Sequence, residues 1–94
     1  MIHQQKRYVN KLELSVLVQR AFQNKGTTRL YGYHNYKDSK EEFSFPIIVV
    51  AKDSQIDRTK LKEKQETELI VKGILKFFAP RKQYLLIAQG IEYV

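Results

Sequence analysis

The 94-residue sequence contains no cysteine, only two histidines, and no apolar run near the roughly 20 residues that span a bilayer. The lack of cysteine excludes disulfides, zinc–cysteine clusters and thiol nucleophiles, so the hydrophobic core must stabilise the fold alone. Residues 1–10 are polar and basic and lack the apolar segment of a signal peptide. These absences predict a cytoplasmic protein that makes no contact with membranes.

Sequence signals of catalysis are also missing. The sequence has no HExxH, P-loop or GxGxxG motif, and its ten carboxylates lie mostly beside lysines in charged stretches. We therefore expect a protein that is not an enzyme and that needs no cofactor. A metal site is not expected, because no other ligands cluster with His3 or His34. Two interpretations of His34 stay open, a hydrogen bond within a sheet or stacking on a base.

The charge of the chain is strongly positive, at +7 with an isoelectric point near 9.7. Such an excess attracts polyanions, and nucleic acid is the leading class of partner. The alternative is that surface lysines only keep a small protein soluble. A hydrophobic content of 43% is enough for one core. We expect a basic flexible leader at residues 1–9 and a single domain at 10–94.

Five stretches have the pattern of β-strands. Aliphatic residues alternate with other residues from Leu12 to Val18, and further strands are predicted over Thr27–Tyr36, Glu42–Ala51, 66–78 and 84–93. Gly26 can adopt the positive φ that a tight turn between the first two strands needs. Pro46 cannot donate to a strand ladder, so we expect it at an unpaired edge or a bulge.

The charged stretch from Lys52 to Gln65 differs from these strands. Asp53 or Ser54 can cap a helix there, and Ile56 and Leu61 are its only apolar residues, which predicts one short surface helix. The order is then three strands, a helix and two strands. An all-β, five-stranded Greek-key barrel with one short helix between strands three and four, the OB-fold, accounts for this order and leaves few exposed edges.

Four segments, 10–18, 45–50, 69–75 with Gly73, and 88–93, resemble bacterial single-stranded-DNA-binding proteins and primosomal replication protein N. The resemblance implies an OB-fold that binds single-stranded DNA in replication or primosome assembly. The sequence departs from this family in two respects. It has no tryptophan to serve as a base platform, and no acidic tail follows Val94, which points to the short primosomal type or to an accessory subunit.

Aromatic and basic residues interleave in the second strand and in the last hairpin, as single-stranded nucleic acid requires for stacking and phosphate contacts. In an OB-fold, the surface of strands two and three and the loop between strands four and five bind oligonucleotides. The predicted nucleic-acid-binding residues are Arg29, Tyr31, Tyr33, Tyr36, Lys37, Lys72, Lys76, Phe77, Phe78, Arg81, Lys82 and Tyr84.

Some rings are expected to be structural. Phe43, Phe45 and Tyr93 are predicted to pack in the core, and successive strand residues point to opposite faces, so one of Phe77 and Phe78 should be buried. The predicted helix has four cations that form either a solvated face or a second basic patch: Arg58, Lys60, Lys62 and Lys64.

A second hypothesis is a small accessory subunit that docks on a polymerase, primase or helicase and helps to hold its template. It rests on apolar residues that could be exposed, namely Leu17, Phe22 and Phe78. Single-stranded RNA is a further possible ligand, since nothing in the sequence distinguishes it from DNA. A homodimer is compatible with either function.

Overall fold

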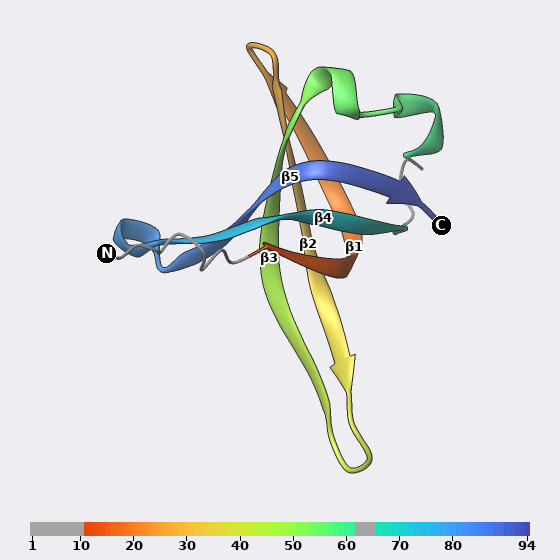
Figure 1. Cartoon of the computed structure of the whole chain (residues 1–94), viewed down its shortest axis with the longest axis vertical. Coiled ribbons are helices and arrows are strands. Elements are labelled where there is room, and N and C mark those ends of the chain that lie inside the picture. The colour runs from red at the N-terminus through yellow and green to blue at the C-terminus, as the bar shows by residue number, and fades with distance from the viewer. Residues whose placement is uncertain (1–10, 62–65) are drawn as a thin grey trace, which may run out of the picture.

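The computed structural model of the chain describes residues 11–61 and 66–94, and five strands make up most of this part. The strands are β1 (Lys11–Asn24), β2 (Thr27–Lys37), β3 (Glu42–Lys52), β4 (Thr67–Phe78) and β5 (Gln83–Tyr93). They close into a barrel in the order β1-β2-β3-β5-β4 (Figure 1). All neighbours are antiparallel except β3 and β5, which pair in parallel over Ile48–Val50. The structure therefore confirms the predicted five-stranded OB-fold.

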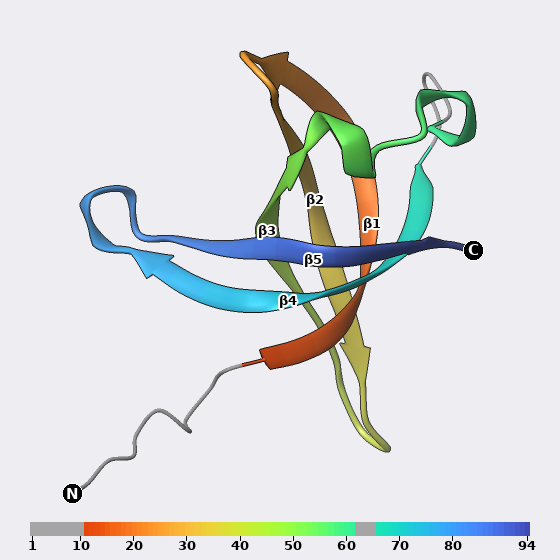
Figure 2. The same ribbon diagram turned by 45° about the horizontal axis from the view of Figure 1, so that its top comes forward.

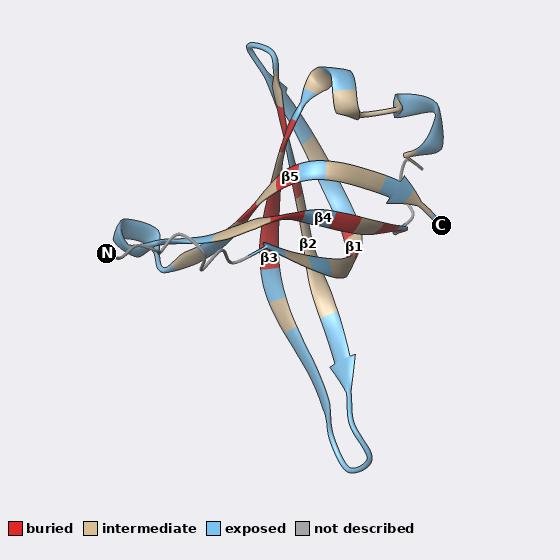
Figure 3. Ribbon diagram, viewed as in Figure 1, coloured by how far each residue is buried: buried red, intermediate tan, exposed pale blue. Residues whose placement is uncertain are grey.

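Apolar residues on the inner faces of all five strands form the core. It includes Val16, Leu30, Val49, Leu69 and Leu86, each no more than 1% exposed. The core occupies the middle of the barrel, and exposed residues dominate the ends of the β2–β3 and β4–β5 hairpins (Figure 3). Because β2 contributes Leu30 to this core, one of its two faces is a core face, which its sequence did not reveal.

Two glycines allow neighbouring strands to approach closely. A Cβ on Gly32 would lie 2.0 Å from the carbonyl oxygen of Leu17, and one on Gly73 would lie 2.1 Å from that of Ile87. No side chain fits at either distance. The predicted tight turn after β1 is also confirmed, because Lys25 and Gly26 both have positive φ (52° and 86°). This two-residue turn matches the right-handed twist of its strands.

Pro46 lies where one side of β3 is free, as predicted. The β3–β5 pairing begins only at Ile48, while the β2–β3 register passes Pro46 without a shift. Pro46 therefore lies at an unpaired strand edge, which is one of the two predicted settings. β3 has no bulge at this residue.

The stretch between β3 and β4 contains two single 3-10 turns, Asp53–Gln55 and Arg58–Lys60, where one short helix was predicted. Asp57, not Asp53 or Ser54, caps a turn, accepting from the backbone N–H of Thr59 at 3.1 Å. The Asp53 carboxylate is already occupied, because Thr28 Oγ1 donates to it at 2.6 Å and Gln23 Nε2 at 2.8 Å. These bonds tie the first 3-10 turn to the β1–β2 hairpin.

Parts of some predictions lie outside the described residues, namely the leader at 1–9 and the cations Lys62 and Lys64. Within the described ranges, the helical turns are too short and too polar to cross a bilayer.

Candidate nucleic-acid interface

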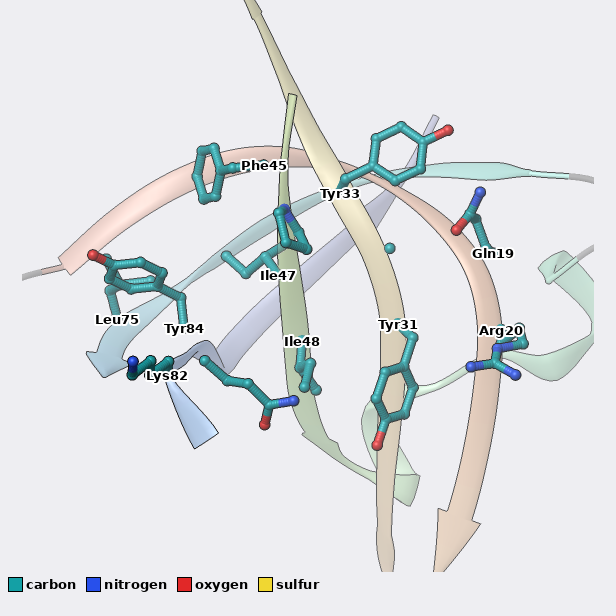
Figure 4. A pocket seen from close by; sticks show the side chains of 13 residues that line it. Gln19, Arg20, Tyr31, Tyr33, Phe45, Ile47, Ile48, Leu75, Lys82 and Tyr84 are labelled. Atoms are coloured by element: carbon teal, nitrogen blue, oxygen red, sulfur yellow. The ribbon is translucent and has the colours of Figure 1, made fainter. Parts of the chain in front are cut away.

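A groove of about 780 Å³ opens on the outer face of β2 and β3 and runs over the free side of β3 to the β4–β5 hairpin. Its aromatic lining comes from Tyr31 and Tyr33 on the outer face of β2, from Tyr84 of β5, and from Phe45, which reaches the groove from the inner face of β3 at its free side. Figure 4 shows Arg20 beside the Tyr31 ring on one side and Lys82 beside Tyr84 on the other. The groove thus combines aromatic surfaces with a cation at either side.

The β1 side of the groove is an aromatic and cationic cluster. The ring of Phe22 contacts that of Tyr31 edge to face, with centroids 5.5 Å apart. The Arg20 guanidinium lies over both rings, 5.4 Å from the centroid of Phe22 and 6.0 Å from that of Tyr31. Cation–π contacts of this kind hold an arginine in place without neutralising its charge. Arg20 therefore stays available to an anion.

A β-bulge places Arg20 in this cluster. The β1–β2 register pairs Val18 with Gly32 and then Arg20 with Tyr31, so Gln19 is an extra residue in β1. Without it, strict alternation would direct Arg20 to the core face that Val16 and Val18 occupy. This shift explains why the sequence pattern did not identify Arg20, Phe22 or Gln19 as site residues.

One carboxylate borders the groove. Glu66 accepts a hydrogen bond from the Tyr33 hydroxyl at 2.6 Å and another from Gln19 Nε2 at 3.2 Å. The bond to the Glu66 carboxylate raises the pKa of Tyr33, which therefore remains a protonated donor. Glu66 fixes the Tyr33 ring by its hydroxyl and makes this corner of the groove unfavourable for a phosphate.

The hairpin side of the groove is built around the Tyr84 ring. Its centroid lies 5.0 Å from that of Phe77 and 6.4 Å from that of Phe45. Lys82 follows the 3-10 turn Ala79–Arg81 with a left-handed backbone (φ 51°) and lines the groove beside Tyr84. A non-glycine residue costs about 1–2 kcal/mol in this conformation.

The predicted site residues fall into three groups. Tyr31, Tyr33, Lys82 and Tyr84 meet in the groove, and Phe77 supports Tyr84. Four exposed residues surround the groove or its hairpin without lining it: Arg29, Lys76, Phe78 and Arg81. Lys72 belongs to neither, because it lies in β4 between Glu13 of β1 and Gly90 of β5. Tyr36 and Lys37 lie elsewhere, on the part of the β2–β3 hairpin that projects from the barrel (Figures 1 and 2).

The structure corrects several assignments of aromatic rings. Phe77 and Phe78 are both exposed, although one was expected inside, because the end of the β4–β5 hairpin extends past the core. Phe43 is exposed as well and is not a core residue. Phe45 and Tyr93 do pack against the core, as predicted, but both remain partly accessible.

His34 makes a contact within the sheet. His34 Nδ1 lies 2.7 Å from the carbonyl oxygen of Ser15, which favours the interpretation of a hydrogen bond within the sheet. Over residues 11–61 and 66–94, acidic and histidine side chains nowhere gather in a group of three that could hold a metal ion.

No protein-family model matches the sequence, and no curated protein sequence does either. Solved structures do match. PriB from Ralstonia solanacearum is similar with a TM-score of 0.66 and 13% identity, over 90% of this chain and 97% of that one. A small single-stranded DNA-binding protein from Streptomyces coelicolor has a TM-score of 0.69 and 14% identity, over 92% and 93% of the two chains.

The N-terminal domain of PriB from Thermoanaerobacter tencongensis, solved as a dimer, has a TM-score of 0.59 and 14% identity, over 90% of this chain and 96% of that domain. At these identities the likeness establishes the fold. The resemblance to this group of proteins, inferred from four short segments of sequence, is confirmed at that level.

Proposed function

We propose that the chain binds single-stranded DNA in the groove on β2 and β3, by stacking bases on its rings and holding phosphates with the flanking cations. The observation that carries the proposal is the gathering of Tyr31, Tyr33 and Tyr84 in one groove that Arg20 and Lys82 also line. Stacking of one base on an aromatic ring contributes about 1–3 kcal/mol and tolerates any sequence. The similar fold of PriB and of a single-stranded DNA-binding protein supports the same function.

The geometry suggests a path for the strand. Phosphates are favoured beside Lys82 and Arg20 and disfavoured beside Glu66, while bases face the rings between them. The strand would then run from the β4–β5 hairpin across β3 and β2 toward β1. Arg29, Lys76 and Arg81 are exposed near either end of this path and would extend the contact with the backbone.

Fluorescence anisotropy with a labelled oligothymidylate over a salt series tests this function. Binding should weaken with salt, with a log–log slope of about −0.7 for each phosphate neutralised. A duplex of equal length should bind more weakly, because its bases are not free to stack. No detectable binding at low salt would refute the proposal. Competition with a matched RNA oligomer measures the preference for DNA.

We further propose a setting in DNA replication or primosome assembly, which the likeness to PriB supports. The alternative is an accessory subunit that docks on a polymerase, primase or helicase. The exposed Phe78, which lies outside the groove, is the observation in its favour. Co-purification of tagged protein from its native host distinguishes the two. An accessory subunit should bring down such an enzyme after nuclease treatment, whereas a partner held only through DNA should be lost.

A further inference from the structure

The β2–β3 hairpin continues beyond the barrel as a two-stranded arm. The β1–β2 pairing ends at Tyr33 and the β3–β5 pairing begins at Ile48, so residues 34–45 pair only with one another among the described strands. Both views of the ribbon show this arm projecting from the barrel (Figures 1 and 2). Two strands alone are marginally stable in water, so an arm of this length gains from a further contact.

The arm is amphipathic. Its alternation puts four rings on the face that continues the barrel core, in the cross-strand pairs His34–Phe45 and Tyr36–Phe43. The first pair is covered near the barrel, where His34 bonds to β1 and Phe45 packs against the core. The outer pair is not, since Tyr36 is 51% and Phe43 48% exposed. Beyond the barrel this aromatic face has no cover within the described chain.

The end of the arm is acidic in a basic protein. Residues 37–42 carry three carboxylates and two lysines, whereas the whole chain has a net charge of +7. Lys37 lies 3.7 Å from Glu42 and is partly neutralised by it. Asp38 accepts the backbone N–H groups of Lys40 and Glu41 at 2.9 and 2.8 Å, which lowers its pKa and keeps it ionised. The arm is therefore unfavourable for phosphate.

The end of the β4–β5 hairpin has the complementary character. Residues 76–82 contain three cations and no carboxylate, and they expose Phe77 (54%) and Phe78 (43%). The two hairpins meet near the barrel, at the contact of Phe45 with Tyr84, and then diverge (Figures 1 and 2). Within one chain their ends do not cover each other.

We propose that the acidic aromatic arm of one copy docks on the basic β4–β5 hairpin of a second copy, and that the second copy returns the same contact about a two-fold axis. Such an exchange closes on itself and leaves no free end for further association. The contact buries the rings of Tyr36 and Phe43 against those of Phe77 and Phe78, and it brings the acidic end of the arm beside the basic end of the hairpin. An apolar centre with a polar rim is the usual composition of a protein interface.

One consequence rests on the proposed function. The β4–β5 hairpin also borders the groove, through Lys82 and Tyr84. The arm of a second copy and a DNA strand would therefore compete for it. Free protein would be dimeric, and binding of single-stranded DNA would separate the copies.

Sedimentation velocity over a range of protein and salt concentrations tests the contact without DNA. The wild type should form a dimer that weakens with salt. The double variant Tyr36→Ser/Phe43→Ser should remain monomeric where the wild type is dimeric, with an unchanged circular dichroism spectrum. Asp38→Lys/Glu41→Lys, which leaves the rings and the core in place, should weaken dimerisation at least about tenfold, the equivalent of 1.4 kcal/mol.

Phe22→Ser is the matched control, because Phe22 is also 51% exposed and belongs to neither hairpin end. It should leave the dimer intact. A wild type that is monomeric at every concentration, or a dimer that both arm variants retain, would overturn the proposal.

Addition of oligothymidylate to the dimer then tests the competition. We expect the dimer to separate into monomers that carry bound DNA. A dimer that binds DNA without separating would contradict competition for the β4–β5 hairpin. If neither the wild type nor the monomeric Tyr36→Ser/Phe43→Ser variant binds DNA, the proposed function is refuted. The sedimentation results without DNA still show whether the two copies make the proposed contact.

Discussion

The β2–β3 and β4–β5 hairpins differ in what they offer a ligand, although both extend past the core and both expose aromatic rings. The end of the β4–β5 hairpin, residues 76–82, has three cations and no carboxylate, and the hairpin contributes Lys82 and Tyr84 to the groove. The β2–β3 arm carries three carboxylates at its end, in residues 37–42. Its exposed rings lie on the face of β2 and β3 that is opposite to Tyr31 and Tyr33. Exposed rings alone therefore do not identify a nucleic-acid surface. The charges beside them and the face on which they lie decide it.

Both hairpins depend on closure of the barrel, and the largest effect on closure is expected from a substitution of Gly73. Gly73→Val should destabilise the fold by about 3 kcal/mol or more, because even a Cβ would lie 2.1 Å from the Ile87 carbonyl oxygen. Chemical denaturation measures the loss. Gly90→Ala is the control, since nothing lies within 4 Å of a Cβ there, and it should change stability by less than about 1 kcal/mol. Equal effects of the two changes would contradict the close approach at Gly73.

A ring from each hairpin gives the next largest contrast. Tyr84→Ala should weaken binding of oligothymidylate about tenfold through the loss of one stacking surface. Tyr36→Ala removes an equally accessible ring from the arm and should leave the affinity unchanged. Fluorescence anisotropy at protein concentrations below self-association measures both. A larger loss for Tyr36→Ala would assign the binding surface to the arm.

One lysine in each hairpin separates the effect of a charge beside the groove from the effect of net charge. Lys82→Gln shortens the side chain only slightly but removes its positive charge at the edge of the groove. The log–log salt dependence of DNA binding should become shallower by about 0.7 in slope, because the variant neutralises one phosphate fewer. Lys40→Gln removes the same charge from the arm. If it changes the slope as much, attraction depends on net charge alone and not on the groove.

The smallest expected effects concern two aspartates whose pKa is lowered by hydrogen bonds, Asp38 in the arm and Asp53 beside the barrel. A lowered pKa in the folded state stabilises the fold above the ordinary aspartate pKa of about 3.9, and this contribution is lost as the pH falls through the lowered pKa. As the pH falls, the Asp53→Asn variant should therefore lose less of its free energy of unfolding than the wild type does. Asp38→Asn should change only local hydrogen exchange in the arm. A global effect from Asp38 would show that the arm and the barrel unfold together.

Much of the fold followed from the sequence because alternation is a local signal. The strand ends predicted for β3, β4 and β5 lie within one residue of the observed ones, and Gly26 marked its turn. The short helix was less predictable, since Asp53 bonds to Gln23 and Thr28 across the fold and is not available as a cap. A sequence pattern cannot show which distant side chains compete for a carboxylate.

The site was predictable only in part, for two physical reasons. Alternation reveals which residues share a face but not how far the barrel extends beneath them, so the exposed Phe43 was taken for a core residue. A bulge leaves no mark in composition either, and the one at Gln19 brought Arg20 beside Tyr31. The rings of Tyr31, Tyr33 and Tyr84 were identified because they interleave with basic residues in the sequence.

Photo-crosslinking directly tests whether single-stranded DNA occupies the groove on β2 and β3, because it reports contact and not affinity. An oligonucleotide carrying 5-iododeoxyuridine should crosslink to rings of the groove, with modified peptides mapped to Tyr31, Tyr33 or Tyr84, and the matched rings Tyr36 and Phe43 should stay unmodified. Crosslinks confined to Tyr36 and Phe43 would contradict a binding groove on β2 and β3 and would assign the nucleic acid to the arm.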